Sequence, residues 1–185
     1  MKKTKKHWLD AGLDILEQWG EKKLKIDFLC QQLNMTKGSF YHHFANRKEY
    51  IYELLEYWSK KYTTEIIETI AKIDEPTEKT YQLIKKVLVI PQNTEITIRI
   101  WALQNETVRQ FQQQVDDVRI RFFETYLQNT NDDILLNEKN AQLIYTYYVG
   151  CQYLLPRISQ EDYIEMLNHL LTIVGLPPYF HNVDK

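Results

Sequence analysis

The chain has 185 residues, 44% of them hydrophobic, with only five glycines and five prolines. This composition suits one globular domain, or a small domain attached to a larger one, and excludes a loop-rich or disordered chain. The net charge of −2 is divided unevenly: residues 1–50 carry ten Lys/Arg against six Asp/Glu, and residues 51–185 carry thirteen against nineteen.

A basic N-terminal part on an acidic body indicates that the first part meets a polyanion. Chance clustering on a solvated surface explains the charges equally well if they are taken alone. No apolar run approaches the roughly 18 residues of a membrane span, and the N-terminus lacks the apolar segment of a secretory signal, so we expect no membrane contact. Cys30 and Cys151 have no metal-ligand spacing, and we expect buried thiols in a reducing cytoplasm.

Helical periodicity dominates the chain from its start. The first helix is predicted over Lys5–Trp19, closed by Gly20, and a short second helix over Asp27–Leu33. Thr36 is a good N-cap for a third helix over Lys37–Phe44.

A long fourth helix begins after Asn46, which pairs with Glu49 as a capping signal. With no breaker before Pro76 it covers about 27 residues, or roughly 40 Å, enough to join two bodies. Breaks at Pro76, Pro91, the polar loop 128–133 and Pro156 divide the rest into about five more helices. Residues 94–100 alternate apolar and polar like a strand, but a lone strand would have no partner, so we predict a helix there too.

The segment TKGSFYHHFANRKE, residues 36–49, carries the most specific pattern. On a helix Phe40 and Phe44 share one face, and Gly38 and His42 point almost opposite. An exposed glycine within a helix lowers its stability by about 1 kcal/mol relative to alanine. Such a glycine is useful where a partner must approach the backbone closely.

The side chains around that glycine suit nucleic acid, since they supply a lysine and several hydrogen-bond donors. Arg47 and Lys48 oppose the helix dipole in the first turn of the fourth helix, but with the free N–H groups there they would form an anion site. Two short helices joined by a tight turn describe a helix-turn-helix. A small helix with an ordinary polar surface would explain the phenylalanines, but neither the glycine nor the basic first turn.

Residues 28–51, FLCQQLNMTKGSFYHHFANRKEYI, resemble the DNA-binding signature of TetR/AcrR-type transcriptional regulators. The matching positions are Thr36, Gly38, Tyr41, His43, Phe44 and Arg47. The sequence departs from the family pattern at Asn34-Met35, where Gly-Val is usual, at Cys30 in place of alanine, and at Lys25 in place of the threonine that commonly opens the second helix. Asparagine tolerates the left-handed turn at modest cost, whereas Lys25 leaves that helix cap in question.

The resemblance implies an all-α fold of about nine helices. A DNA-binding domain would span residues 1–50, and a helical effector-binding and dimerisation domain residues 51–185. Lys37 and Gly38 would face bases, and phosphates would be held by Thr36, Ser39, Tyr41, His42, His43 and Arg47, with Lys25 and Lys48 as further contacts. The N-terminal lysines Lys2, Lys3, Lys5 and Lys6 would either add DNA contacts or form a solvated tail.

The sequence gives little support for a metal site or an enzyme active site. Adjacent histidines on a helix diverge by about 100°, so His42 and His43 cannot easily close on one metal ion. There is no nucleophile elbow, phosphate loop or HExxH motif, so we predict neither an enzyme nor a bound cofactor.

The back half is rich in aromatic residues, and in the family this body encloses an inducer pocket. Trp101, Phe122, Tyr126 and Tyr147 are the candidate lining residues. The segment 141–155 is apolar on both sides and therefore needs two partners, its own core and a second surface. The predicted dimer seam consists of Tyr148, Cys151, Leu155, Leu167, Leu170, Leu171 and Val174.

The sequence thus predicts a cytoplasmic homodimeric repressor that binds a palindromic operator in double-stranded DNA and is released by an unidentified small molecule. Two alternatives stay open within regulators: an activator, and a factor that binds DNA without a ligand. A helical ligand carrier or an enzyme that reuses the fold is the alternative from another class.

Overall fold

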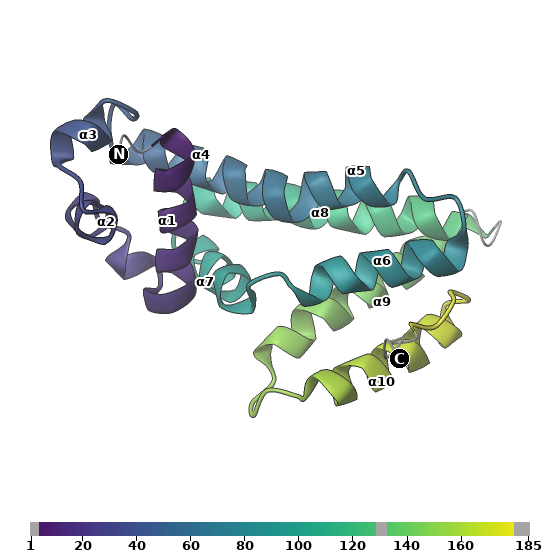
Figure 1. Cartoon of the computed structure of the whole chain (residues 1–185). Helices are drawn as coiled ribbons and strands as arrows, with labels where there is room; N and C mark the ends of the chain where they lie inside the picture. The colour runs from purple at the N-terminus through teal and green to yellow at the C-terminus, as the bar shows by residue number, and fades with distance from the viewer. Residues whose placement is uncertain (1–3, 129–132, 180–185) are drawn as a thin grey trace, which may run out of the picture. The chain divides into compact units, whose positions relative to one another are not determined.

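The structure, a computed structural model, describes residues 4–128 and 133–179. Over these residues it contains helices and turns but no strand, which confirms the all-α class. A π-helical turn joins α4 to α5 without a break, so the ten α-helical segments of this described part form nine continuous helices (Figure 1). Lys2, Lys3 and most of the predicted loop 128–133 lie outside the described residues.

The helices follow the predicted order along the chain. They are α1 (Lys5–Trp19), α2 (Ile26–Leu33), α3 (Lys37–Tyr41), α4 (Arg47–Ser59), α5 (Glu65–Ile70), α6 (Pro76–Leu88), α7 (Gln92–Ala102), α8 (Glu106–Gln128), α9 (Ile134–Tyr153) and α10 (Gln160–Ile173). The third helix is shorter than predicted, because the chain turns after Tyr41; the Phe44 N–H still donates to the Phe40 carbonyl at 3.0 Å. None of the helices described has the length and apolarity that a bilayer crossing requires.

The helices gather into two compact units. Unit 1 comprises Met1–Tyr62 and Pro91–Val115, and unit 2 comprises Thr63–Ile90 and Asp116–Lys185. These units differ from the predicted division at residue 50, because α4, α7 and the first part of α8 pack with the N-terminal helices.

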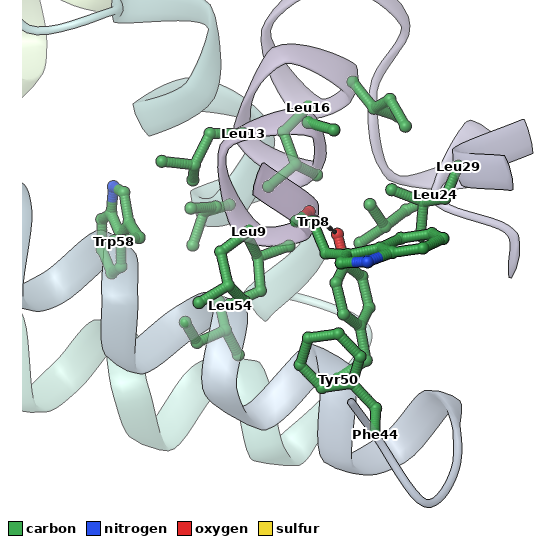
Figure 2. Close-up of a cluster of buried hydrophobic side chains, with 14 of the residues drawn as sticks. Trp8, Leu9, Leu13, Leu16, Leu24, Leu29, Phe44, Tyr50, Leu54 and Trp58 are labelled. Atoms are coloured by element: carbon green, nitrogen blue, oxygen red, sulfur yellow. Dashed lines mark hydrogen bonds between the residues drawn. The ribbon is translucent and has the colours of Figure 1, made fainter. Parts of the chain in front are cut away.

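Unit 1 is built around α1, which packs against α2, α4 and α7. Figure 2 shows the apolar side chains of α1 beside Leu29 of α2 and Leu54 of α4. Trp8 and Trp58 are fully buried, and the Tyr50 hydroxyl donates to the Trp8 carbonyl at 2.9 Å. Gly12 lies where α1 packs closely on α4: a Cβ there would collide with the Tyr50 hydroxyl and press on Leu54.

The strand-like stretch 94–100 is helical, as predicted, and lies in α7. Its buried positions include polar side chains, which explains why a hydrophobic pattern did not reveal the helix. Thr94 donates from its N–H and its hydroxyl to Glu17 Oε2 at 2.5 and 2.9 Å. Glu95, which is 1% exposed, accepts from Trp58 Nε1 at 2.9 Å. These bonds fix α7 to α1 and α4 within unit 1.

The predicted long fourth helix is present over Arg47–Ile70, although it stops a few residues early and contains the π-helical turn Lys60–Thr64. Its α4 part belongs to unit 1 and its α5 part to unit 2. The core of unit 2 combines residues of α6, α8, α9 and α10 with the segment that follows: Ile84, Tyr126, Leu127, Ala141, Ile144, Leu167, Leu170, Leu171, Val174, Leu176 and Tyr179.

Candidate nucleic-acid interface

The turn between α2 and α3 is set by Asn34, which adopts the left-handed conformation with φ 51°. The Met35 N–H then donates to the Cys30 carbonyl at 2.8 Å, which closes the end of α2. Thr36 caps α3, as predicted, by accepting the Ser39 N–H on its hydroxyl at 3.3 Å. Asn34 thus adopts the left-handed conformation for which glycine is usual at this turn, since the short polar side chain of asparagine tolerates positive φ.

Two phenylalanines fix the orientation of α3. Phe40 and Phe44 are 0% and 1% exposed, and the Phe40 ring meets Trp8 edge-on with centroids 5.5 Å apart. Phe44 packs in the same manner on Tyr50 at 5.0 Å (Figure 2). Because this face of α3 is held inside unit 1, the opposite face is directed to solvent.

The outward face carries most of the predicted DNA contacts. Its exposed members are Thr36, Lys37, Gly38, Tyr41 and His42, whereas Ser39 and His43 are half-buried. A Cβ on Gly38 would meet only the Thr36 hydroxyl at 3.7 Å, an ordinary van der Waals distance. The fold of the described chain therefore gives no steric reason for this glycine.

Lys37 has a partner that the sequence did not reveal. Its ammonium lies 2.6 Å from Asp27 Oδ1 on α2, with both side chains largely exposed. The hydrogen bond with Asp27, together with the carboxylate charge, raises the pKa of Lys37, which therefore stays protonated. The pair spans positions ten residues apart on two helices, so no helical i, i+4 rule points to it.

Two side chains, those of Asn46 and Glu49, each accept a backbone N–H at the start of α4. Asn46 Oδ1 accepts the Glu49 N–H at 3.0 Å, and the Glu49 carboxylate accepts the Ala45 N–H at 2.7 Å. Arg47 donates from Nε to the Leu24 carbonyl at 3.1 Å, so it also ties α4 to the loop before α2. Lys48 is exposed.

The remaining predicted basic contacts have mixed environments. Lys25 is exposed at the N-cap position of α2 and makes no side-chain cap bond there. Lys5 forms an ion pair with Glu53, and Lys6 with Asp10 at 3.0 Å. These two lysines are thus partly neutralised by α4 and by α1 itself.

The predicted ligand-lining residues divide between the units. Trp101 is half-buried against the core of unit 1, whereas the other three belong to unit 2. The Tyr126 hydroxyl bonds Thr80 at 2.6 Å and the Pro76 carbonyl at 3.0 Å, and its ring lies 6.2 Å from that of Phe122. The Tyr147 hydroxyl donates to the Tyr163 carbonyl at 2.7 Å.

The predicted dimer residues also divide. The four on α10 and at its end (Leu167, Leu170, Leu171 and Val174) are buried in the core of unit 2, which removes them from the free surface. Tyr148 and Cys151 are half-buried, and Leu155 is 90% exposed. The large apolar residues exposed on or directly after α9 and α10 include Leu143, Tyr153, Leu154, Met166 and Ile173.

The chain resembles known proteins in its fold but not in its sequence. No protein-family profile and no curated protein sequence matches the chain. A TetR-family transcriptional regulator from a Rhodococcus species superposes with a TM-score of 0.76 at 16% identity, over 92% of this chain and 97% of that one. An AcrR-family regulator from Aquifex aeolicus VF5 gives 0.73 at 19% identity, over 93% and 99%.

AibR, solved with isovaleryl coenzyme A and operator DNA, gives a TM-score of 0.63 at 15% identity, over 95% of this chain and 99% of that one. The three matches span almost the whole of each chain. The chain therefore has the fold of TetR/AcrR-type transcriptional regulators, as residues 28–51 predicted.

Proposed function

We propose that the chain is a DNA-binding transcriptional regulator that reads its operator with α3. The observation that carries this proposal is the outward face of α3, where an exposed glycine without a structural reason lies between Lys37 and the donors Ser39, Tyr41 and His42. A helix held from behind by Phe40 and Phe44 presents that face as a rigid unit. The same fold in AibR was solved with operator DNA.

We assign base contacts and phosphate contacts to these residues from the length of each side chain and its position on the helix. Lys37 and Gly38, at the start of α3, enter the major groove, where lysine reads guanine and glycine lets the backbone approach. Tyr41, His42 and the α4 start with Lys48 contact phosphates and set the register. Arg47 combines a phosphate contact with its bond to Leu24, and so holds both the fold and the DNA.

We further propose that the regulator is a homodimer, assembled through the outer face of α9. Leu143 and Gly150 are seven residues apart and therefore share one side of α9, and Leu154 follows directly after the helix, four residues beyond Gly150. Leu143 and Leu154 are 47% and 46% exposed, and a Cβ on Gly150 would meet no atom within 4 Å in the part of the chain that the structure describes. A second copy of the chain would cover this stripe, and a two-fold axis would pair two α3 helices with half-sites about 34 Å apart.

Release by a small molecule is the regulatory part of the proposal. The continuous helix Arg47–Ile70 begins beside α3 in unit 1 and ends in unit 2, so a ligand held by unit 2 has a covalent route to α4. A ligand that binds the two conformations of this helix unequally would shift operator affinity. AibR was solved with isovaleryl coenzyme A, a small-molecule ligand.

Selection of binding sites from random double-stranded DNA tests the proposal. We expect a palindrome whose half-sites lie one DNA turn apart. Lys37→Ala should weaken binding to that site more than to random DNA. Lys72→Ala removes an equal charge from an exposed position in unit 2 and should leave both affinities unchanged. Failure to enrich any site, with the DNA upstream of its own gene also unbound, would reject the proposal.

A further inference from the structure

An unpaired amide is buried inside unit 2. Gln152, on the last turn of α9, is 6% exposed, and among the described residues neither its Nε2 nor its Oε1 has a hydrogen-bond partner. A primary amide offers two donors and an acceptor, and burying these without partners is unfavourable to folding. Buried unpaired groups are uncommon in folded proteins, and each one calls for an explanation, of which a functional role is one.

The amide belongs to a polar and aromatic face. Tyr145, Tyr148 and Gln152 follow one another at intervals of three and four residues and therefore share one side of α9. The two tyrosine rings are stacked with centroids 6.0 Å apart. The Tyr145 hydroxyl donates to Asp116 Oδ1 on α8 at 2.6 Å, so this side of α9 faces α8.

Arg119 joins the same cluster from α8. It is 8% exposed, and its guanidinium carbon lies 5.8 Å from the centre of the Tyr148 ring. Its Nε donates at 3.0 Å to the hydroxyl of Thr63, which is itself 3% exposed and lies in the π-helical turn. π-helical turns are rare and are found frequently at functional sites. A cation, two aromatic rings and an unsatisfied amide are thus neighbours in unit 2, beside the π-helical turn that precedes α5.

We propose that this cluster is the effector site, and that its ligand is a small planar molecule with an amide-like edge, an N–H donor beside a carbonyl acceptor. Such an edge pairs with both halves of the Gln152 amide at once, and a planar body suits the tyrosine rings and the guanidinium plane. The role as an effector site rests on the proposed regulatory function, whereas ligand binding itself does not. A ligand that moves Arg119 alters its bond to Thr63, and so acts on the helix that leads to α3.

Thermal unfolding of the full chain without DNA gives the first test. Gln152→Leu keeps a similar volume and removes the unpaired amide, so the melting temperature should rise by roughly 2–4 °C or more. Gln113→Leu makes the same change at an exposed position of α8 and should leave the melting temperature nearly unchanged. A lower melting temperature for Gln152→Leu would show that the amide stabilises the fold, and would overturn the proposal.

Fragment binding gives the second test, with benzamide, N,N-dimethylbenzamide and benzoate as probes. Benzamide offers both a donor and an acceptor, dimethylbenzamide only an acceptor, and benzoate an anion. We expect benzamide to stabilise the wild-type chain most, and this preference to disappear in Gln152→Leu. Equal effects of the two amides, stronger binding of benzoate, or no binding of benzamide at tens of millimolar would overturn the ligand class. Because no DNA is present, these outcomes are independent of whether the chain binds an operator.

Discussion

At Gly38, a substitution is expected to affect the stability of α3 and the affinity for DNA in opposite directions. The space beside its Cα is open, since the nearest atom to an added Cβ would be the Thr36 hydroxyl at 3.7 Å. Gly38→Ala should therefore stabilise α3, by about 0.5–1 kcal/mol, because alanine is the better helix former. The same methyl group would stand between the backbone and the DNA, so operator affinity should fall.

Urea unfolding and fluorescence anisotropy on the selected operator would measure these two effects on one variant. A Gly38→Ala protein with unchanged operator affinity would contradict a close approach of DNA to this backbone. Loss of stability would instead point to a structural need for the glycine.

Mutating the two members of the Asp27–Lys37 ion pair should change DNA affinity in opposite directions. Exposed pairs of this kind contribute little to stability, typically about 0–1 kcal/mol, so breaking it should barely affect folding. Asp27→Asn removes a negative charge next to the outward face of α3 and frees Lys37, and should raise affinity for specific and random DNA alike. Lys37→Ala should lower affinity, mainly for the specific site.

Titrations of both variants at one salt concentration would test this ion pair. Weaker DNA binding by Asp27→Asn would mean that the carboxylate positions Lys37 for its base rather than competing with the phosphates. That result would give Asp27, which the sequence did not identify, a supporting role in DNA recognition.

At the scale of helices, two glycines distinguish tight packing within unit 1 from the free surface of α9. Gly12→Ala would drive a methyl group against the Tyr50 hydroxyl and Leu54, and overpacking of this kind lowers stability by about 1–3 kcal/mol. A Cβ on Gly150 would meet no atom of the described residues within 4 Å, so Gly150→Ala should leave the stability of the protomer unchanged or higher. It should weaken self-association, because the proposed seam requires close approach there.

Denaturant unfolding of the two variants, with sedimentation velocity for Gly150→Ala, separates the two roles. Equal stability of Gly12→Ala and the wild type would show that α1 and α4 adjust freely. An unchanged dimer in Gly150→Ala would place the seam elsewhere.

The hydrogen bonds that hold α7 against the N-terminal helices can be tested by mutation. Thr94→Val keeps the shape of the side chain but removes the hydroxyl that donates to Glu17. The lost hydrogen bond, which leaves part of a half-buried carboxylate unpaired, should lower the free energy of unfolding by about 1–3 kcal/mol. Thermal unfolding against Thr64→Val, a change at an exposed threonine whose side chain makes no cap bond, is the measurement. An equal melting temperature for the two variants would mean that Thr94 is not part of the attachment.

For the molecule as a whole, local patterns predicted most of the architecture. The caps at Thr36 and Asn46, the left-handed Asn34 and the proline breaks are encoded by neighbouring residues, and all appear where predicted. The division into two units was not predictable in this way. It depends on contacts such as Glu17 with Thr94, which join residues 77 positions apart.

The candidate site was predictable to a similar degree. Helical geometry alone placed Phe40 and Phe44 inside and Gly38 outside. It gave no sign of the Asp27–Lys37 pair or of the Arg47 bond to Leu24, since each joins separate elements. Nor does a hydrophobic pattern say whether an apolar face of α10 meets its own core or a second copy; its leucines proved to be core residues.

Salt-dependent binding to the selected operator tests the central claim most directly. If α3 and the start of α4 hold phosphates, the logarithm of the association constant should fall linearly with the logarithm of salt concentration, by about 0.9 per phosphate contacted. The wild-type chain should show a slope of several units and should prefer the operator over random DNA throughout the salt range, whereas Lys37→Ala should lose much of that preference. Binding that is independent of salt, or a preference that survives in Lys37→Ala, would contradict the account.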